Sequence, residues 1–223
     1  MSENTLHLRI LENKDWATLL FVLSFAIVAV TKSVFENRFS EFVKLLYSNK
    51  YITIYKDSSH LKSGFTIALF LVQIISFSFL IQILLSCFGM ASKTDWVLFI
   101  QLVTFLTYFV MAKFLIEKII ATAFDIEEFM EHFNLQKVMY RTYIGLIILP
   151  FAVFLFYSKS VSSTIPLLIL GALLLANTIV YLVLIKNYQN LIISKLFYFI
   201  LYLCALEIAP YYFMYYWFTK SIA

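Results

Sequence analysis

The chain has 223 residues, of which 62% are hydrophobic and only 13% are charged. Soluble domains are about 45–50% apolar and about 25% charged, so this chain lacks the polar surface that water requires and must be solvated largely by lipid. Its net charge of +4 does not indicate nucleic-acid binding, because the basic residues lie between apolar runs, where membrane topology explains them. The composition predicts one all-α membrane domain over residues 1–223.

Six apolar segments are long enough to cross a membrane as helices, which takes about 20 residues. The first is the shortest as a purely apolar run, and it reaches full length if Lys32 extends its ammonium group into the headgroup region. The predicted spans are approximately 16–34, 64–88, 96–118, 139–157, 164–185 and 196–218.

Lysine and arginine residues predict the orientation of these spans. They are more frequent in the first, third and fifth connections than at the two termini and in the second and fourth connections. Basic residues favour the cytoplasmic side, so both termini are expected on the opposite face, the periplasmic side of a bacterial inner membrane.

The first cytoplasmic connection, at about 35–58, has an amphipathic pattern. Phe35, Phe39 and Phe42 recur at helical spacing on one face, while polar residues such as Arg38 occupy the other. This pattern predicts a helix lying in the membrane interface. The segment is either a connector resting on the membrane or a surface that docks a partner protein through these three phenylalanines.

The second cytoplasmic connection is acidic and is predicted to continue the third helix beyond the bilayer. Met130 and Phe133 share its apolar face. A di-iron site would need a second Glu-x-x-His sequence, and the chain contains none. We interpret the segment as a solvated acidic face and expect no metal, although its acidic residues and histidine are close in sequence: Asp125, Glu127, Glu128, Glu131 and His132.

The last predicted helix carries a carboxylate, Glu207, about midway, with Pro210 three residues later. A charge at the bilayer centre costs several kcal/mol on insertion scales, so the carboxyl group needs hydrogen-bonding partners. Pro210 has no amide hydrogen and leaves the Leu206 carbonyl without its helical donor. The glutamate and the proline are expected to form one polar kink. Pro150 is expected to kink the fourth helix in the same way.

Counting residues from the helix ends places Gln73, Tyr108 and Asn177 near the depth of Glu207. These side chains are the predicted hydrogen-bonding partners of the carboxyl group in the interior of the bundle. Lys113 lies about 9 Å nearer the cytoplasm and is expected to extend to the interface instead. Glu207 is either a packing carboxyl group or a proton-linked, substrate-contacting group. The packing role is favoured because proton relays use chains of acids, and no second acid lies at this depth.

The sequence predicts neither catalysis nor a cofactor. No histidine stands with a serine or cysteine in a nucleophile pattern. Cys87 and Cys204 are expected at different depths, too far apart for a disulfide. Aromatic residues at the outer helix ends are typical of an interface belt. The tyrosines that end the last helix cover more than one face, so some of them should contact protein, either this chain or a partner, and Tyr212 and Tyr216 are the candidates for a partner.

Four stretches carry a resemblance to a known family: NKDW, RFSEFVKLLYSNKY, YRTYIGLIILPF and YLCALEIAPYY. From Asp15 to Phe218 the chain resembles a domain-of-unknown-function family of multi-pass inner-membrane proteins from Bacteroidetes. The resemblance implies a location in the bacterial cytoplasmic (inner) membrane and brings no catalytic residue or reaction.

These observations favour a non-enzymatic integral membrane subunit of a larger cell-envelope complex. Its expected partners are the lipid bilayer and other membrane protein subunits, and protein export or envelope biogenesis fits such a role. The alternative is a small proton-linked transporter or channel that uses Glu207.

Overall fold

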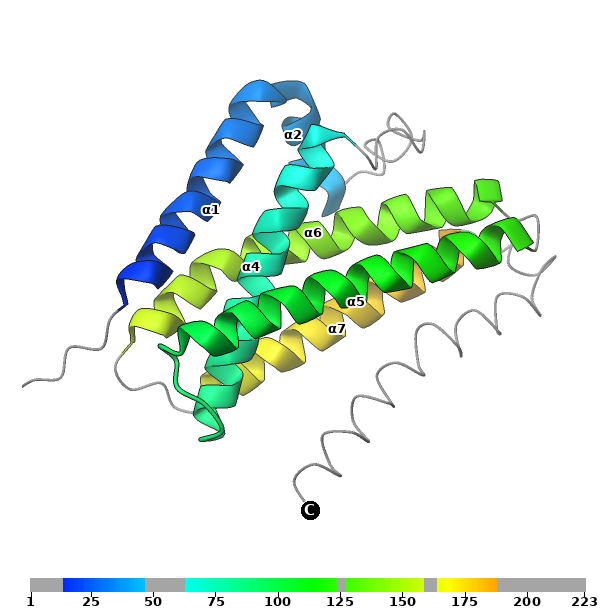
Figure 1. Ribbon diagram of the computed structural model, residues 1–223. Helices are drawn as coiled ribbons and strands as arrows, with labels where there is room; N and C mark the ends of the chain where they lie inside the picture. The colour runs from blue at the N-terminus through cyan, green and yellow to red at the C-terminus, as the bar shows by residue number, and fades with distance from the viewer. Residues whose placement is uncertain (1–13, 47–62, 124–126, 159–163, 188–223) are drawn as a thin grey trace, which may run out of the picture.

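The computed structural model describes residues 14–46, 63–123, 127–158 and 164–187, and every structural statement below concerns these residues. They fold into helices joined by turns, which confirms the predicted all-α class (Figure 1). The elements in chain order are α1 (Asp15–Val34), α2 (Glu36–Val43), η1 (Lys44–Leu46), α4 (Gly64–Cys87), α5 (Trp96–Ala123), α6 (Glu127–Tyr157) and α7 (Thr164–Asn187).

Four of the described helices contain a stretch long and apolar enough to cross a membrane. These stretches are Asp15–Val34, Gly64–Cys87, Trp96–Ala123 and Phe133–Tyr157, close to the first four predicted spans. The fifth predicted span is helix α7, whose apolar part Thr164–Val180 is shorter. The sixth, at 196–218, lies outside the described residues.

Helix α4 is the centre of the described bundle. It packs against α6, α5, α1 and α7, and it crosses behind α5 in Figure 1. Of its membrane-length stretch, 61% is buried inside the molecule, compared with 11% for α5. A helix that is apolar on every side is expected to be surrounded by other helices. The short polar side chains of α4, from Gln73 to Gln82, are therefore buried among protein neighbours.

The turn between α4 and α5 is set by local sequence. Gly89 adopts a left-handed φ of 72°, a conformation that suits glycine. Its amide donates to the Ser86 carbonyl and the next amide donates to Leu85, the double bond of a Schellman cap. The carboxylate of Asp95 then accepts hydrogen bonds from the amides of Val97 and Leu98 and caps the start of α5.

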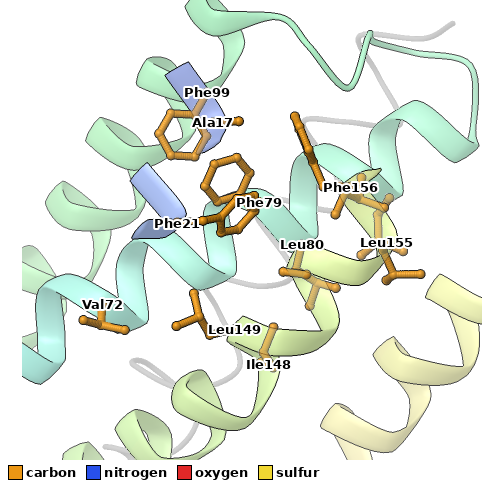
Figure 2. Packing of buried hydrophobic residues seen from close by; sticks show 13 residues of the cluster. Ala17, Phe21, Val72, Phe79, Leu80, Phe99, Ile148, Leu149, Leu155 and Phe156 are labelled. Carbon is orange, nitrogen blue, oxygen red and sulfur yellow. The ribbon is translucent and has the colours of Figure 1, made fainter. Parts of the chain in front are cut away.

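Aromatic side chains from four helices form the main core at one end of the bundle. We call this group the aromatic cluster: Trp16 and Phe21 of α1, Phe79 of α4, Phe99 of α5 and Phe156 of α6. The Phe21 and Phe79 rings stack with centroids 4.1 Å apart, and Figure 2 shows them beside Phe99 and Phe156. Trp16, near the start of α1, packs inward on Phe79 and Phe99.

Helix α2 folds back onto the start of α4, and the three phenylalanines predicted as a docking surface contact residues of this chain. Phe42 is 0% exposed and meets the Phe65 ring edge to face. Phe35 also contacts Phe65, and Phe39 is half-buried against the same group. Phe42 therefore has no surface to offer a partner. Phe35 and Phe39 make contacts within the chain. Residues 47–58 of the predicted interfacial segment lie outside the described residues.

Arg38 was assigned to the exposed polar face of this segment, and the structure buries it. Its Nη1 donates to the Ser63 hydroxyl at 2.8 Å, and its guanidinium lies 4.6 Å from the centroid of the Phe65 ring. Ser63 is the N-cap of α4. A planar cation can bury its flat face on an aromatic ring while its edge donates hydrogen bonds. The amphipathic pattern predicted a helix here correctly, but it placed Arg38 on an exposed face, whereas the side chain is buried.

The acidic segment extends the fourth predicted helix and not the third. Helix α5 ends at Ala123, and α6 begins at Glu127 and runs unbroken to Tyr157. The Thr122 hydroxyl donates to Glu127 Oε1 at 2.6 Å, which joins the end of α5 to the start of α6. Met130 and Phe133, predicted on one apolar face, are both buried.

Candidate functional site

Polar groups meet where α4 crosses α6, and we call this place the crossing site: Gln73, Ser76, Thr142 and Gly145. Gln73 is buried, and its Oε1 accepts a hydrogen bond of 3.0 Å from the Thr142 hydroxyl. The Ser76 hydroxyl donates to the Gly145 carbonyl at 2.9 Å. Two side-chain hydrogen bonds therefore join α4 and α6 at this crossing.

Gly145 makes this close crossing possible. A Cβ atom at this position would lie 2.8 Å from Gln73 Cγ and 3.1 Å from Gln73 Cα. These distances are too short for a carbon contact, so the α4 backbone occupies space that any other residue at 145 would fill. Small residues let membrane helices approach closely in this way, and the approach brings the Gly145 carbonyl within reach of Ser76.

A second buried polar group joins α5 to α6. Lys137 Nζ lies 2.6 Å from Glu117 Oε1, and the two side chains are 6% and 3% exposed. We call these two residues the charge pair. Lys137 also lies 5.8 Å from the centroid of the Phe133 ring. A buried ion pair is strongly destabilised when one partner is removed, because the other charge is left uncompensated.

Two further polar side chains are buried one helical turn from the charge pair. Lys113, one turn before Glu117 on α5, is 7% exposed, and Asn134, one turn before Lys137 on α6, is also buried. The expectation that Lys113 extends to the membrane interface is therefore wrong. Its side chain lies on the same side of α5 as Glu117, because residues four apart share a helix face, and that side packs against protein.

The structure does not bring the predicted partners of Glu207 together. Gln73 lies at the crossing site, whereas Tyr108 is 75% exposed on α5 and Asn177 is exposed on α7. Glu207 and Pro210 lie outside the described residues, as do Tyr212 and Tyr216. Pro150 lies inside α6, which continues as a helix to Tyr157.

Tyr108 belongs to a line of polar residues on the outer side of α5, which we call the α5 stripe: Gln101, Thr104 and Tyr108. All three side chains are exposed, and their i, i+3, i+7 spacing places them on one side of the helix. Within the described part of the chain none of the three makes a side-chain hydrogen bond. The α5 stripe and Glu117 of the charge pair therefore lie on different sides of this helix.

Sequence reasoning missed most of the buried polar contacts. The sequence alone identified neither Glu117 and Lys137 as a pair nor Thr142 and Gly145 as contacts between helices. One signal for the charge pair was available: Glu117 and Lys137 carry opposite charges at the facing ends of two apolar segments that follow one another in the chain. Thr142 and Gly145 are small residues on one face of an apolar helix, and small residues are enriched where membrane helices contact one another.

Among the described residues no three histidine, cysteine, aspartate or glutamate side chains gather in a way that could hold a metal ion. The crossing site holds hydroxyl and amide groups, and the charge pair holds an ammonium and a carboxylate. Each of these groups is used between helices. Such an arrangement fixes how the helices lie against one another.

The chain belongs to the family described as Domain of unknown function (DUF4271), whose family model matches residues 17–218. This confirms the resemblance to a domain-of-unknown-function family. No curated protein and no solved structure matches the chain. The matched region includes the crossing site, the charge pair and the α5 stripe, so all three belong to the family domain.

Proposed function

We propose that this protein is a non-catalytic integral membrane subunit of a larger cell-envelope complex. The α5 stripe is its docking face, and the occupant is a membrane-spanning helix of a different protein. The observation that carries the proposal is the exposure of hydrogen-bonding side chains on a helix long and apolar enough to cross a membrane.

The depth of Tyr108 supports a protein partner over lipid. Tyr108 follows Trp96 by about 18 Å along α5 at 1.5 Å per residue, which places it near the middle of a hydrocarbon layer about 30 Å thick. Tyrosines in membrane helices gather at the interfaces, where the hydroxyl group reaches water. A hydroxyl group facing acyl chains at midplane loses its hydrogen bonds, and a helix with polar groups at matching spacing restores them.

The charge pair supports the same role by fixing the rotation of α5. Lys113 and Glu117 lie roughly opposite the α5 stripe around the helix, given about 100° per residue. Their burial against α6 therefore turns the stripe outward. Apolar residues beside the stripe, such as Phe105 and Leu115, are also exposed, and they add a surface on which a partner helix can pack.

The cellular setting comes from the resemblance. It supports an inner-membrane location, and protein export or envelope biogenesis suits a small subunit of this kind. The distribution of lysine and arginine supports both termini in the periplasm. The stripe itself requires only a membrane partner with hydrogen-bonding groups near midplane.

The proposal is tested by photo-crosslinking in native membranes. A benzoylphenylalanine placed at Tyr108 is expected to form an adduct with a membrane protein of a different sequence, identified by its mass and peptides. The matched control is the same probe at Val22, which is exposed on the apolar side of α1 and should give lipid adducts only. In a Thr104 probe strain, Tyr108→Leu should remove most of the protein adduct.

Three results at position 108 contradict this role: adducts with lipid alone, with a second copy of this chain, or with the chain's own residues 188–223. A separate result favours the transport alternative. If the purified chain in vesicles carries a flux that Glu207→Gln abolishes, the protein is a transporter and not an accessory subunit.

A further inference from the structure

We infer that Lys113, Lys137 and Arg141 form a binding site for a phosphate group at the contact between α5 and α6. We call these three residues the phosphate site. The inference concerns a small ligand near one end of the bundle and does not depend on the proposed docking face of α5. All three residues lie in the part of the chain that the structure describes.

The ion pair between Glu117 and Lys137 fixes the register of the two helices. Helices α5 and α6 run side by side in opposite directions (Figure 1), and Lys137 Nζ lies 2.6 Å from Glu117 Oε1. Lys113 lies one turn before Glu117 on α5, and Arg141 lies one turn after Lys137 on α6. In antiparallel helices Lys113 and Arg141 therefore fall at one level, on the sides that the ion pair joins.

This contact holds more positive than negative charge. Lys113 and Lys137 are buried, and Arg141 is partly buried. Among the residues that the structure describes, Glu117 is the one carboxylate on the facing sides of α5 and α6 at this level. Three cations are thus grouped around one anion.

The described acids at the start of α6 do not balance this charge. Glu127 and Glu131 are exposed, and they lie about 9–15 Å from Lys137 along the helix at 1.5 Å per residue. Glu127 accepts a hydrogen bond from Thr122. Buried cations in excess of anions are costly at the edge of a membrane, so the excess charge favours an anionic ligand.

Arg141 indicates the chemistry of that ligand. Its guanidinium group makes no hydrogen bond or ion pair within the described ranges. A guanidinium group presents its N–H donors in a planar fork that matches two oxygens of one phosphate, whereas a lysine ammonium group acts as a point charge. One arginine with two lysines beside it therefore suits a phosphate group.

The depth of the site points to the phosphate of a lipid. Lys113 lies about 26 Å from Trp96 along α5, and Arg141 lies about 24 Å from Tyr157 along α6. A hydrocarbon layer about 30 Å thick that begins at Trp96 and Tyr157 ends close to this level, where lipid phosphates lie. Basic pockets between membrane helices bind anionic headgroups in such places. Ile116, beside the site on α5, is 44% exposed and can contact an acyl chain.

The ligand is tested by unfolding the purified full-length protein in detergent micelles, because a ligand that binds the folded state raises the unfolding midpoint. Phosphatidylglycerol should raise the midpoint, and phosphatidylcholine, whose choline neutralises its phosphate, should raise it much less. A rise with sodium phosphate over sodium chloride at equal ionic strength supports the site but assigns it to a soluble phosphate compound. An equal rise with both lipids and none with phosphate, or no rise with phosphatidylglycerol or phosphate, overturns the inference.

Substitution of Arg141 tests the site itself. Arg141→Gln should weaken phosphatidylglycerol binding by at least about tenfold, because hydrogen bonds between charged groups are lost. Arg141→Lys keeps the charge without the planar fork and should weaken binding less. Binding is measured in each variant as the dependence of its own midpoint on lipid concentration, so a loss of stability is not mistaken for a loss of binding.

The matched control is Lys118→Gln, which removes an exposed cation of α5 next to Glu117 and should leave binding unchanged. If Lys118→Gln weakens binding as much as Arg141→Gln, the lipid is attracted by the general charge of this end and the site does not exist. Unchanged binding in Arg141→Gln overturns the inference as well.

Discussion

The aromatic cluster and the charge pair are both buried, but lipid affects them in opposite ways. In water, burial of the rings of Phe21, Phe79 and Phe99 would stabilise the fold simply by removing them from the solvent. Acyl chains are as apolar as these rings, so in a membrane the cluster contributes mainly packing and ring geometry. Glu117 and Lys137 cannot face acyl chains unpaired without a large cost. In lipid, therefore, burial of the rings contributes less to the stability of the fold than it would in water, and exposure of Glu117 and Lys137 costs more.

The two regions also differ in how many helices they join. The aromatic cluster draws side chains from α1, α4, α5 and α6, so it brings four helices to a common centre. The charge pair joins only α5 and α6. Rings can exchange one apolar neighbour for another, whereas an ion pair has one geometry. The cluster sets which helices are adjacent, and the charge pair sets the rotation of one helix against another.

The largest expected effect comes from breaking the charge pair. Lys137→Met removes the ammonium group 2.6 Å from the buried Glu117 carboxylate, and the free energy of unfolding should fall by about 3–5 kcal/mol. The measurement is unfolding in mixed detergent–SDS micelles, followed by tryptophan fluorescence. The double variant Glu117→Leu with Lys137→Met removes both charges and should recover most of this loss. If the double variant is as unstable as the single one, packing and not charge compensation holds α5 to α6.

The positions of the helices could be predicted because hydropathy and length are local properties. The predicted span 64–88 and the observed Gly64–Cys87 differ by one residue, and Ser63 and Gly89 mark the two ends with ordinary capping chemistry. The side-chain partners could not be predicted in this way. Which residues Glu117 and Gln73 meet depends on how helices cross, and a single sequence does not specify the crossing.

Amphipathic patterns revealed a face but not what covers it. The phenylalanines of α2 were correctly placed on one side of a helix, yet Phe42 packs on Phe65 and not on lipid or a partner. The guanidinium group of Arg38 is compatible with an exposed position, which the pattern predicted, and with the observed hydrogen bond to Ser63. Tyr108 shows the reverse case, because a residue expected in the bundle interior lies on the outer side of α5. A helix face covered by protein and a helix face covered by lipid have the same apolar pattern in the sequence, so the pattern does not tell them apart.

The aromatic cluster should lose less stability than the charge pair when one ring is removed. Phe79→Ala leaves a cavity among Phe21, Phe99 and Phe156, and in water-soluble proteins this change costs about 3–5 kcal/mol. Because acyl chains reduce the solvent part of that cost, we expect about 3 kcal/mol, measured by the same unfolding assay. Phe105→Ala on the exposed side of α5 is the control and should change little. A loss at Phe79 larger than that of Lys137→Met would reverse the proposed ranking.

The smallest effect is expected at the crossing site, which combines both kinds of contact. Gly145→Ala adds a carbon that would meet Gln73 Cγ at 2.8 Å and the Gln73 backbone at 3.1 Å, so α4 and α6 must move apart. Forcing one extra carbon into a packed contact costs about 1–3 kcal/mol. Gly171→Ala is the matched control, since a Cβ there has nothing within 4 Å and alanine favours a helix over glycine. If both variants are equally stable, the close approach of α4 and α6 does not stabilise the bundle. If only Gly145→Ala is destabilised, the absence of a side chain at one position is what lets the Ser76 and Thr142 hydrogen bonds form.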